Sequence, residues 1–251
     1  MKGCRLKRVI FLTFDVEPDA PPYQSQSDLG IREGLPWILD FLRETGVKAT
    51  FFVTASLVEA SREFEELVNN IVDDGHEIGS HGLDHSRLDR LPLGEAMRHI
   101  RESIKILSSY SKIHSFRAPN LQLPERLLHV LIEEGIRVDS SVASYKAGRV
   151  TEPFWYSDRL LRVPVTSTSS TIRLPEPLAV RATLPGKREF YSLFYHPWEF
   201  VKIRRRPIYR LDIWFRTGGY ARRMLARIVR YAVSSGFRFA LMREAPRLCS
   251  V

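Results

Sequence analysis

An α/β fold with parallel strands, curled into a distorted and incomplete (β/α) barrel, is predicted for this chain of 251 residues. Short apolar runs alternate with amphipathic stretches of ten or more residues, a pattern typical of parallel βαβ units. About seven strand-like runs occur, and no linker rich in glycine, proline or serine divides them. Because 44% of the residues are hydrophobic, the chain can bury a full-sized core, and one domain over residues 1–251 is expected.

The amino-terminal half supplies three alternating pairs of strand and helix. Apolar residues recur at helical spacing in the predicted helices, as at Leu35, Ile38 and Leu42, and Gly46 ends the first of them. The predicted strands are short and rich in aromatic or β-branched residues. In chain order we expect strand 9–14, helix 31–44, strand 49–54, helix 62–73, strand 77–80 and helix 93–110.

The carboxy-terminal half continues the alternation around a less regular middle. Glycine follows the last two predicted helices, at Gly135 and Gly236, where a helix commonly ends. The final run, Phe237 to Met242, is mostly apolar and closes the chain as a strand. In chain order we expect strand 115–117, helix 124–134, strands 136–140, 160–165 and 190–195, helix 220–234 and strand 237–242.

Positive charge is concentrated in the last fifth of the chain. Residues 201–251 hold 13 Lys or Arg against two acids, whereas the first 200 residues are nearly neutral. This segment suits an anionic glycan or an anionic membrane surface as partner. The alternative is the solvated face of a helix and an arginine-rich loop. Nucleic acid is disfavoured, because Lys202 to Arg206 has neither interleaved aromatic residues nor a helix-turn-helix context.

Signals for export or membrane insertion are weak. The apolar run over 9–12 follows several basic residues, but it is too short for a signal peptide and soon meets Asp15. No apolar stretch is long enough to span a bilayer. Cys4 and Cys249 form neither a disulfide framework nor a CxxC metal pair. A cytoplasmic location is therefore expected, with peripheral membrane contact through residues 201–251.

Acidic residues and histidines gather near the ends of two predicted strands. Asp15 and Glu17 are two residues apart and would share one face of a regular strand. His81 and His85 follow the strand over 77–80, and the neighbouring glycines favour a loop over a helix. In an α/β barrel such carboxyl ends meet at one site. Two imidazoles and a carboxylate leave open positions on a divalent ion, as in catalytic zinc or iron sites.

Arg117 and His196 extend this candidate site. Arg117 follows a predicted strand and precedes Pro119, and near a carboxylate its guanidinium would keep that group ionised and oriented. His196 titrates near neutrality, which suits proton delivery to a leaving group. Each residue also has a non-catalytic explanation: Asp15 as a strand cap, Arg117 as an ordinary ion pair, and His196 as a core histidine.

Together these segments resemble the polysaccharide deacetylases with a NodB homology domain, also known as carbohydrate esterase family 4. The order and spacing agree over residues 9–242. The family commonly has two adjacent aspartates in its first motif, whereas Val16 intervenes here, which resembles a branch that includes hydrolases of other linear or cyclic amides. The matching motifs are Asp15-Val16-Glu17, the pair His81 and His85, Arg117-Ala118-Pro119, Val138 to Ser141, and His196.

The resemblance implies a metal-dependent hydrolase that removes N-acetyl groups from an N-acetylated sugar, glycan or glycan precursor. Glu17, His81 and His85 would hold a divalent metal, for which zinc is the first expectation and iron or cobalt are alternatives. Asp19 is an alternative to Glu17 as the carboxylate ligand. Two other functions stay open: a metal-independent hydrolase of another amide, and a non-catalytic protein that binds polyanions or membrane surfaces through residues 201–251.

The same resemblance assigns roles to four further residues. Asp15, positioned by Arg117, would remove a proton from the attacking water, and His196 would protonate the departing amine. Asp139 would orient a neighbouring group. Trp198 would either stack on a sugar ring or lie in the core.

Overall fold

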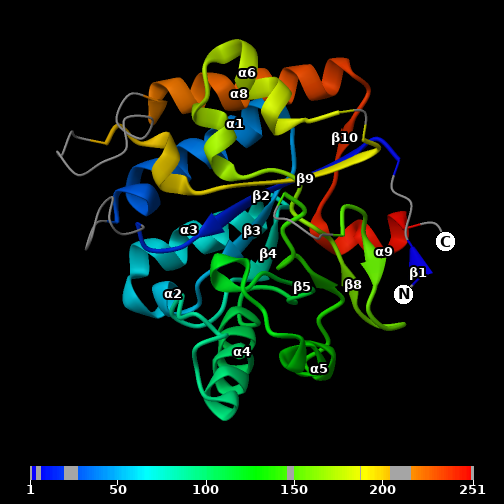
Figure 1. Ribbon diagram of the computed structural model, residues 1–251. Coiled ribbons are helices and arrows are strands. Elements are labelled where there is room, and N and C mark those ends of the chain that lie inside the picture. Colours follow the sequence, from blue (N-terminus) through cyan, green and yellow to red (C-terminus); the bar gives the residue numbers. More distant parts are fainter. Residues whose placement is uncertain are drawn as a thin grey trace.

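A single curled sheet of mainly parallel strands forms the centre of the computed structural model (Figure 1). The structure describes residues 2–3, 7–19, 28–145, 150–186, 188–203 and 216–249. Helices cover the outside of the sheet, which confirms the predicted incomplete barrel. Neighbouring parallel strands are, in order, β9 (Phe190–Tyr195), β2 (Val9–Val16), β3 (Thr50–Val53), β4 (Glu77–Ser80), β5 (Ser115–Phe116), β6 (Val138–Asp139) and β8 (Leu161–Arg162), and β10 (Arg238–Phe239) pairs with the start of β2.

The two edges of the sheet explain why the barrel is incomplete. Beyond β8 the sheet continues through antiparallel pairs, β7 (Phe154–Trp155) and then β1 (Lys2–Gly3), which the sequence analysis did not predict. The β8 edge meets the β9 edge through Thr166, whose N–H donates to Ser192 O (2.9 Å) and whose hydroxyl accepts from Ser192 N–H (3.2 Å). Thr166 lies beyond the end of β8, so this contact joins the two edges at one residue and does not extend β8 as a continuous ladder of hydrogen bonds.

The helices form where apolar residues recur at helical spacing. The predicted helix over 31–44 is present, although its first turn is a π-helix, η1 (Gly30–Gly34), and Gly46 ends it with φ 67°. Several short helices were not predicted, because they are too short to show apolar residues repeating at helical spacing. The α-helices are α1 (Leu35–Thr45), α2 (Ser56–Ala60), α3 (Arg62–Asp73), α4 (Leu93–Leu107), α5 (Leu128–Glu133), α6 (Glu176–Thr183), α8 (Gly219–Ser234) and α9 (Ala245–Leu248).

Strand β2 shows how the sheet positions polar groups. All eight of its residues are buried. Ile10, Leu12 and Phe14 belong to the core shared with the helices, whereas Val9 and Phe11 pack in a second cluster with residues of other strands. Because side chains alternate along a strand, Thr13 and Asp15 continue the row of Val9 and Phe11. Asp15 therefore lies on the inner face near the carboxyl end of the barrel.

The state of Cys249 corrects the expectation that the cysteines form no disulfide. Cys249 is disulfide-bonded, and Cys4 lies outside the described residues. Because disulfides persist mainly in oxidising compartments, the cysteines no longer favour the cytoplasm, and the compartment stays a prediction. No helix in the described part of the chain combines the length and apolar character needed to cross a bilayer. The arginine-rich stretch over 204–215 lies outside the described residues.

Candidate metal centre and active site

A cavity of about 770 Å³ opens at the carboxyl ends of the parallel strands. Asp15 and Glu17 reach it from the end of β2, and His196 reaches it from the end of β9. His81 and His85 reach it from the loop after β4. The structure thus brings together five residues that the sequence analysis predicted to share one site.

Glu17, His81 and His85 form a cluster with the geometry of a metal site. Glu17 Oε2 lies 2.5 Å from His85 Nε2 and 3.2 Å from His81 Nε2, and one ligand atom from each residue lies within 4.8 Å of the others. His81 donates Nδ1–H to the carbonyl of Arg117 (2.8 Å), which leaves Nε2 as the nitrogen that faces Glu17. Two imidazole nitrogens and one carboxylate fit a catalytic zinc or similar ion.

Charge within this cluster favours an ionised carboxylate. Burial alone would raise the pKa of Glu17, but the charge of His196 and the hydrogen bonds from His81 and His85 outweigh burial and lower that pKa well below its ordinary value. Burial also opposes protonation of His85, yet its contact with Glu17 leaves the His85 pKa raised. The three groups are therefore electrostatically coupled.

Glu17, and not Asp19, is the carboxylate that meets the histidines. Asp19 is buried, and its two oxygens accept hydrogen bonds from the Gly30 backbone N–H at 3.1 and 3.3 Å. It thereby fixes the start of η1. The cluster of candidate ligands in the described part of the chain contains Glu17 and does not include Asp19.

The loops around the cavity hold unusual backbone conformations. His85, Asn120 and Leu121 have φ between 56° and 64°, and all three line the cavity. Among the described residues only one further non-glycine residue, Arg8, has a positive φ. Left-handed backbone costs free energy for residues with a Cβ, and such residues often cluster at functional sites. Gly82, at φ 83°, makes the turn between the two histidines.

Asp15 is paired with Arg117 in the floor of the cavity. The Arg117 guanidinium donates to Asp15 Oδ1 at 2.5 Å, and both side chains are almost completely buried. A charge-assisted hydrogen bond of this kind fixes the orientation of the carboxylate. The predicted partnership of these two residues is therefore present.

Arg117 is itself held from several sides. It donates to Thr13 Oγ1 (2.7 Å), to Ser140 Oγ (2.9 Å) and to the Ser140 carbonyl (3.3 Å). Its guanidinium carbon lies 4.2 Å from the centre of the Phe52 ring, a cation–π contact. Thr13 and Ser140 were not predicted as site residues, although Ser140 lies in a recognised motif and Thr13 lies two residues before one.

His196 is supported by a buried ion pair that the sequence did not reveal. Glu199 accepts a hydrogen bond from the His196 backbone N–H (2.9 Å) and lies 3.4 Å from its Nδ1. Arg173, from the 3-10 helix η4 (Ser169–Arg173), pairs with the other oxygen of Glu199. Burial lowers the pKa of the His196 imidazole, although Glu17 and Asp15 act in the opposite direction. Its Nε2 faces Glu17 Oε1 at 3.7 Å.

Asp139 does not line the cavity. One of its oxygens accepts from the N–H and hydroxyl of Ser141 (3.0 and 2.5 Å), and the other accepts from Arg162 (2.7 Å). Ser141 Oγ in turn accepts from the backbone N–H of Ala118 (2.8 Å). Asp139 therefore braces the loop after Arg117, and its orienting role in catalysis stays a prediction.

Trp198 is a buried residue and offers no exposed platform for a sugar. Only 5% of its surface is exposed, and its ring stacks on His196 with 5.7 Å between ring centres. Of its two expected roles, a place in the core is the observed one. Among the described aromatic residues that line the cavity, Tyr145 is the exposed one.

A family model described as polysaccharide deacetylase matches residues 2–138, just over half of the chain. A peptidoglycan-N-acetylglucosamine deacetylase of Bacillus cereus is 34% identical over 102 residues, which are 41% of this chain and 32% of that protein. A peptidoglycan-N-acetylmuramic acid deacetylase of Bacillus subtilis is 33% identical over 118 residues, which are 47% of this chain and 21% of that protein. The matched segments thus span about a third or less of these relatives.

Solved structures of the same family share the fold. A Mycobacterium smegmatis protein assigned to the polysaccharide deacetylases has a TM-score of 0.71 and 20% identity, covering 97% of this chain and 90% of that one. A family 4 pseudoenzyme from Bacillus anthracis has a TM-score of 0.63 and 16% identity, covering 95% of this chain and 65% of that one. The family model and the shared fold agree with the motifs in the cavity. The chain belongs to the polysaccharide deacetylase family.

Proposed function

We propose that this protein is a metal-dependent hydrolase that removes N-acetyl groups from an N-acetylated glycan. The observation that carries the proposal is the convergence of Asp15, Glu17, His81, His85 and His196 on one cavity. Fold alone would not suffice, since a pseudoenzyme has the same fold. The proposal rests on the residues that line this cavity.

Glu17, His81 and His85 would hold the metal, for which zinc is our first expectation. The chemistry that a divalent ion would supply there is a lower pKa of a water molecule and polarisation of the amide carbonyl. The carbonyl of Arg117 keeps the Nδ1 proton on His81, so that the ring presents Nε2 to the site.

Asp15 would act as the general base. Its carboxylate takes a proton from the water whose oxygen attacks the acetyl carbon. Arg117 holds that carboxylate in place, and Thr13 and Ser140 hold Arg117. This buried arrangement limits the orientations open to Asp15 before substrate arrives.

His196 would deliver a proton to the amine nitrogen as the C–N bond breaks, releasing acetate and a free amino sugar. Its Nδ1 faces Glu199, so Nε2 is the nitrogen left to face the cavity. Because burial lowers the pKa of this imidazole, its charged form needs the nearby carboxylates for stability. Glu199 is a positioning residue in this scheme.

The relatives and the cavity support a proposal for the substrate class. The relatives from both Bacillus species are named for deacetylation of peptidoglycan amino sugars. The cavity of about 770 Å³ has room for a sugar residue, and Tyr145 offers an exposed ring at its edge. We therefore propose an N-acetylglucosamine or N-acetylmuramic acid unit of a glycan as the substrate.

The test is release of acetate from a panel of N-acetylated substrates. Purified protein supplied with zinc is incubated with chitin oligomers, peptidoglycan fragments and small linear or cyclic amides. We expect acetate from at least one glycan, and a loss of about 10²- to 10⁴-fold in kcat for Asp15→Asn with bound metal retained. Equal rates for Asp15→Asn and the wild type would contradict the proposed role of Asp15.

Two other outcomes would replace the proposal. Hydrolysis confined to the linear or cyclic amides would favour the amide-hydrolysing branch to which the spaced acid pair Asp15 and Glu17 points. Absence of turnover on every substrate, together with salt-sensitive binding to anionic glycan or vesicles, would favour a non-catalytic binding protein that uses residues 201–251.

A further inference from the structure

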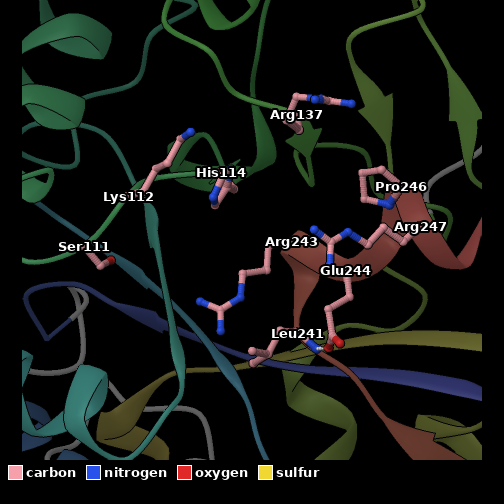
Figure 2. A pocket seen from close by; sticks show the side chains of 9 residues that line it. All are labelled: Ser111, Lys112, His114, Arg137, Leu241, Arg243, Glu244, Pro246 and Arg247. Carbon is pink, nitrogen blue, oxygen red and sulfur yellow. Dashed lines mark hydrogen bonds between the residues drawn. The ribbon is translucent and has the colours of Figure 1, made fainter.

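A second cavity lies at the other end of the barrel and is lined mainly by basic side chains (Figure 2). Its volume is about 550 Å³. His114 and Arg137, which line it, come directly before β5 and β6 in the sequence. The cavity therefore opens at the amino-terminal ends of the strands, away from the metal ligands. The charged or titratable residues that line it are Lys112, His114, Arg137, Arg243, Arg247 and Glu244.

The cations of this cavity differ in their ion pairing from many other surface arginines. Lys112, Arg137, Arg243 and Arg247 have no side-chain ion pair with an acid in the described part of the chain. Many other surface arginines do have one, such as Arg98 with Glu102 at 2.8 Å. The buried Glu77 carboxylate attracts Arg243, but the positive charges beside this cavity still repel one another, and an anion among them would relieve that repulsion.

The pKa of the His114 imidazole is affected by these charges. Burial lowers its pKa first, and the positive charges of Lys112, Arg243, Arg137 and Arg247 lower it further. All four cations are therefore close enough to His114 to affect its charge. Glu244, the one acid among the described lining residues, accepts a hydrogen bond from the Leu241 backbone N–H (2.7 Å).

The backbone that carries these cations is fixed by buried hydrogen bonds. Arg243 N–H donates to Glu77 Oε2 (2.8 Å), and the buried Glu77 carboxylate also accepts from Thr50 (2.9 Å) and Ser115 (2.8 Å). The Arg137 N–H donates to the His114 carbonyl (2.9 Å). Three separate chain segments are therefore locked together around the cavity before any ligand binds, which lowers the cost of binding.

We propose that this cavity binds a phosphate or pyrophosphate group, held by Arg137, Arg243, Arg247 and Lys112. Guanidinium groups match phosphate oxygens in a bidentate geometry, and several of them together favour a multiply charged anion over a single carboxylate. In Figure 2 Arg243 and Arg247 approach from the carboxy-terminal segment, and Lys112, His114 and Arg137 lie across from them. The phosphate belongs either to a soluble compound or to a lipid headgroup.

The probe is inorganic pyrophosphate, added to the full chain and followed by calorimetry and by NMR of the His114 imidazole. We expect saturable binding and an upward shift of the His114 pKa as the anion offsets the positive charges. The double variant Arg137→Gln and Arg243→Gln should bind at least about tenfold more weakly, since it removes two charge-assisted hydrogen bonds to the anion. Arg230→Gln, which removes one exposed charge from α8, should change the affinity less than about twofold.

Vesicles distinguish the two sources of phosphate. Sedimentation with phosphatidic acid in phosphatidylcholine vesicles, lost in the double variant, supports a lipid headgroup, whereas pyrophosphate binding without sedimentation supports a soluble compound. If the double variant does not fold, Arg247→Gln takes its place, and the wild-type NMR titration stands by itself. The proposal is overturned if millimolar pyrophosphate leaves the His114 signals and the heat unchanged, or if Arg230→Gln weakens binding as much as the double variant.

Discussion

Glu17 is the residue on which the three histidines of the site converge. Its two oxygens lie 2.5 Å from His85, 3.2 Å from His81 and 3.7 Å from His196. A glutamate reaches one methylene further than an aspartate and can approach all three rings from the position just after β2. The spaced acid pair is therefore compatible with an intact ligand set, and it leaves Asp15 free to pair with Arg117.

Glu17→Gln tests whether this carboxylate holds metal. The amide keeps the shape of the side chain but removes its negative charge, so zinc affinity should fall by about tenfold or more. Competition with a chromogenic chelator measures the change. Asp19→Asn is the matched control, because Asp19 caps Gly30 instead of facing the histidines; equal losses in both variants would contradict the assignment.

Glu199→Gln tests the support of His196. The neutral amide would stabilise the imidazolium less than the carboxylate does, so we expect kcat to fall by about tenfold with KM nearly unchanged. The alkaline limb of the kcat profile should also move to lower pH, because the charged form of His196, which donates the proton, loses a stabilising neighbour. A change in thermal stability with an unaltered pH profile would mean that Glu199 is only structural.

At the scale of elements, η1 and the 3-10 helix η5 (Pro197–Phe200) position His196 by close backbone packing. A Cβ on Gly34 would lie 2.1 Å from the Pro197 carbonyl oxygen, and one on Gly30 would lie 2.7 Å from the Trp198 nitrogen. Only glycine permits this approach. The two elements are more than 160 residues apart in the sequence, so the pattern of either one could not predict the contact.

Gly34→Ala should therefore destabilise the fold by about 1–3 kcal/mol, since backbone must move to admit the methyl group. Urea unfolding measures the loss, and acetate release should fall with it because the turn that carries His196 shifts. Gly94→Ala in α4 is the control: its Cβ would meet nothing within 4 Å, and alanine is the better helix former. Equal stability of the Gly34 variant and the wild type would rule out the close packing.

His76, at the turn before β4, makes stability depend on pH. Burial and then the charge of Lys48 lower its pKa from 6.5 to about 4. In the unfolded chain the imidazole binds a proton below its ordinary pKa, whereas in the folded protein it does so only near pH 4. Protons therefore favour unfolding between about pH 6.5 and pH 4, and this contribution to stability is lost as the pH falls through that window.

His76→Gln should remove this dependence. Between pH 7 and pH 5 the free energy of unfolding should fall by about 2 kcal/mol less in the variant than in the wild type. Urea titrations at both pH values give the difference. His129→Gln, which replaces an exposed histidine on α5, should keep the wild-type dependence, and the same loss in all three proteins would exclude His76 as the cause.

At the scale of the whole molecule, the sequence predicted most of the barrel. The bounds of α3 (Arg62–Asp73) were those expected, because Phe64, Val68 and Ile71 repeat at helical spacing and are buried. Strands of two residues, such as β1 and β7, are too short to show alternation, and their pairing depends on distant segments. The antiparallel edge of the sheet was therefore missed.

The candidate site was predictable to a similar extent. Asp15, Glu17, His81 and His85 lie next to apolar strands, so the sequence places them at one end of the barrel. The pair between Arg173 and Glu199 was missed, because a buried ion pair between an irregular segment and a turn has no periodic signature. The basic residues of the second cavity were also missed as a group, since three separate segments supply them.

The central claim is that Glu17, His81 and His85 hold the metal that the hydrolysis requires. The most direct test is to titrate zinc into chelator-treated protein while acetate release from an N-acetylated glycan is measured. Activity should be absent at the start, rise in proportion to added zinc and reach its plateau near one equivalent, and His81→Gln should show no such rise. Full activity of the chelated protein, or recovery of the His81→Gln variant at one equivalent of zinc, would contradict the claim.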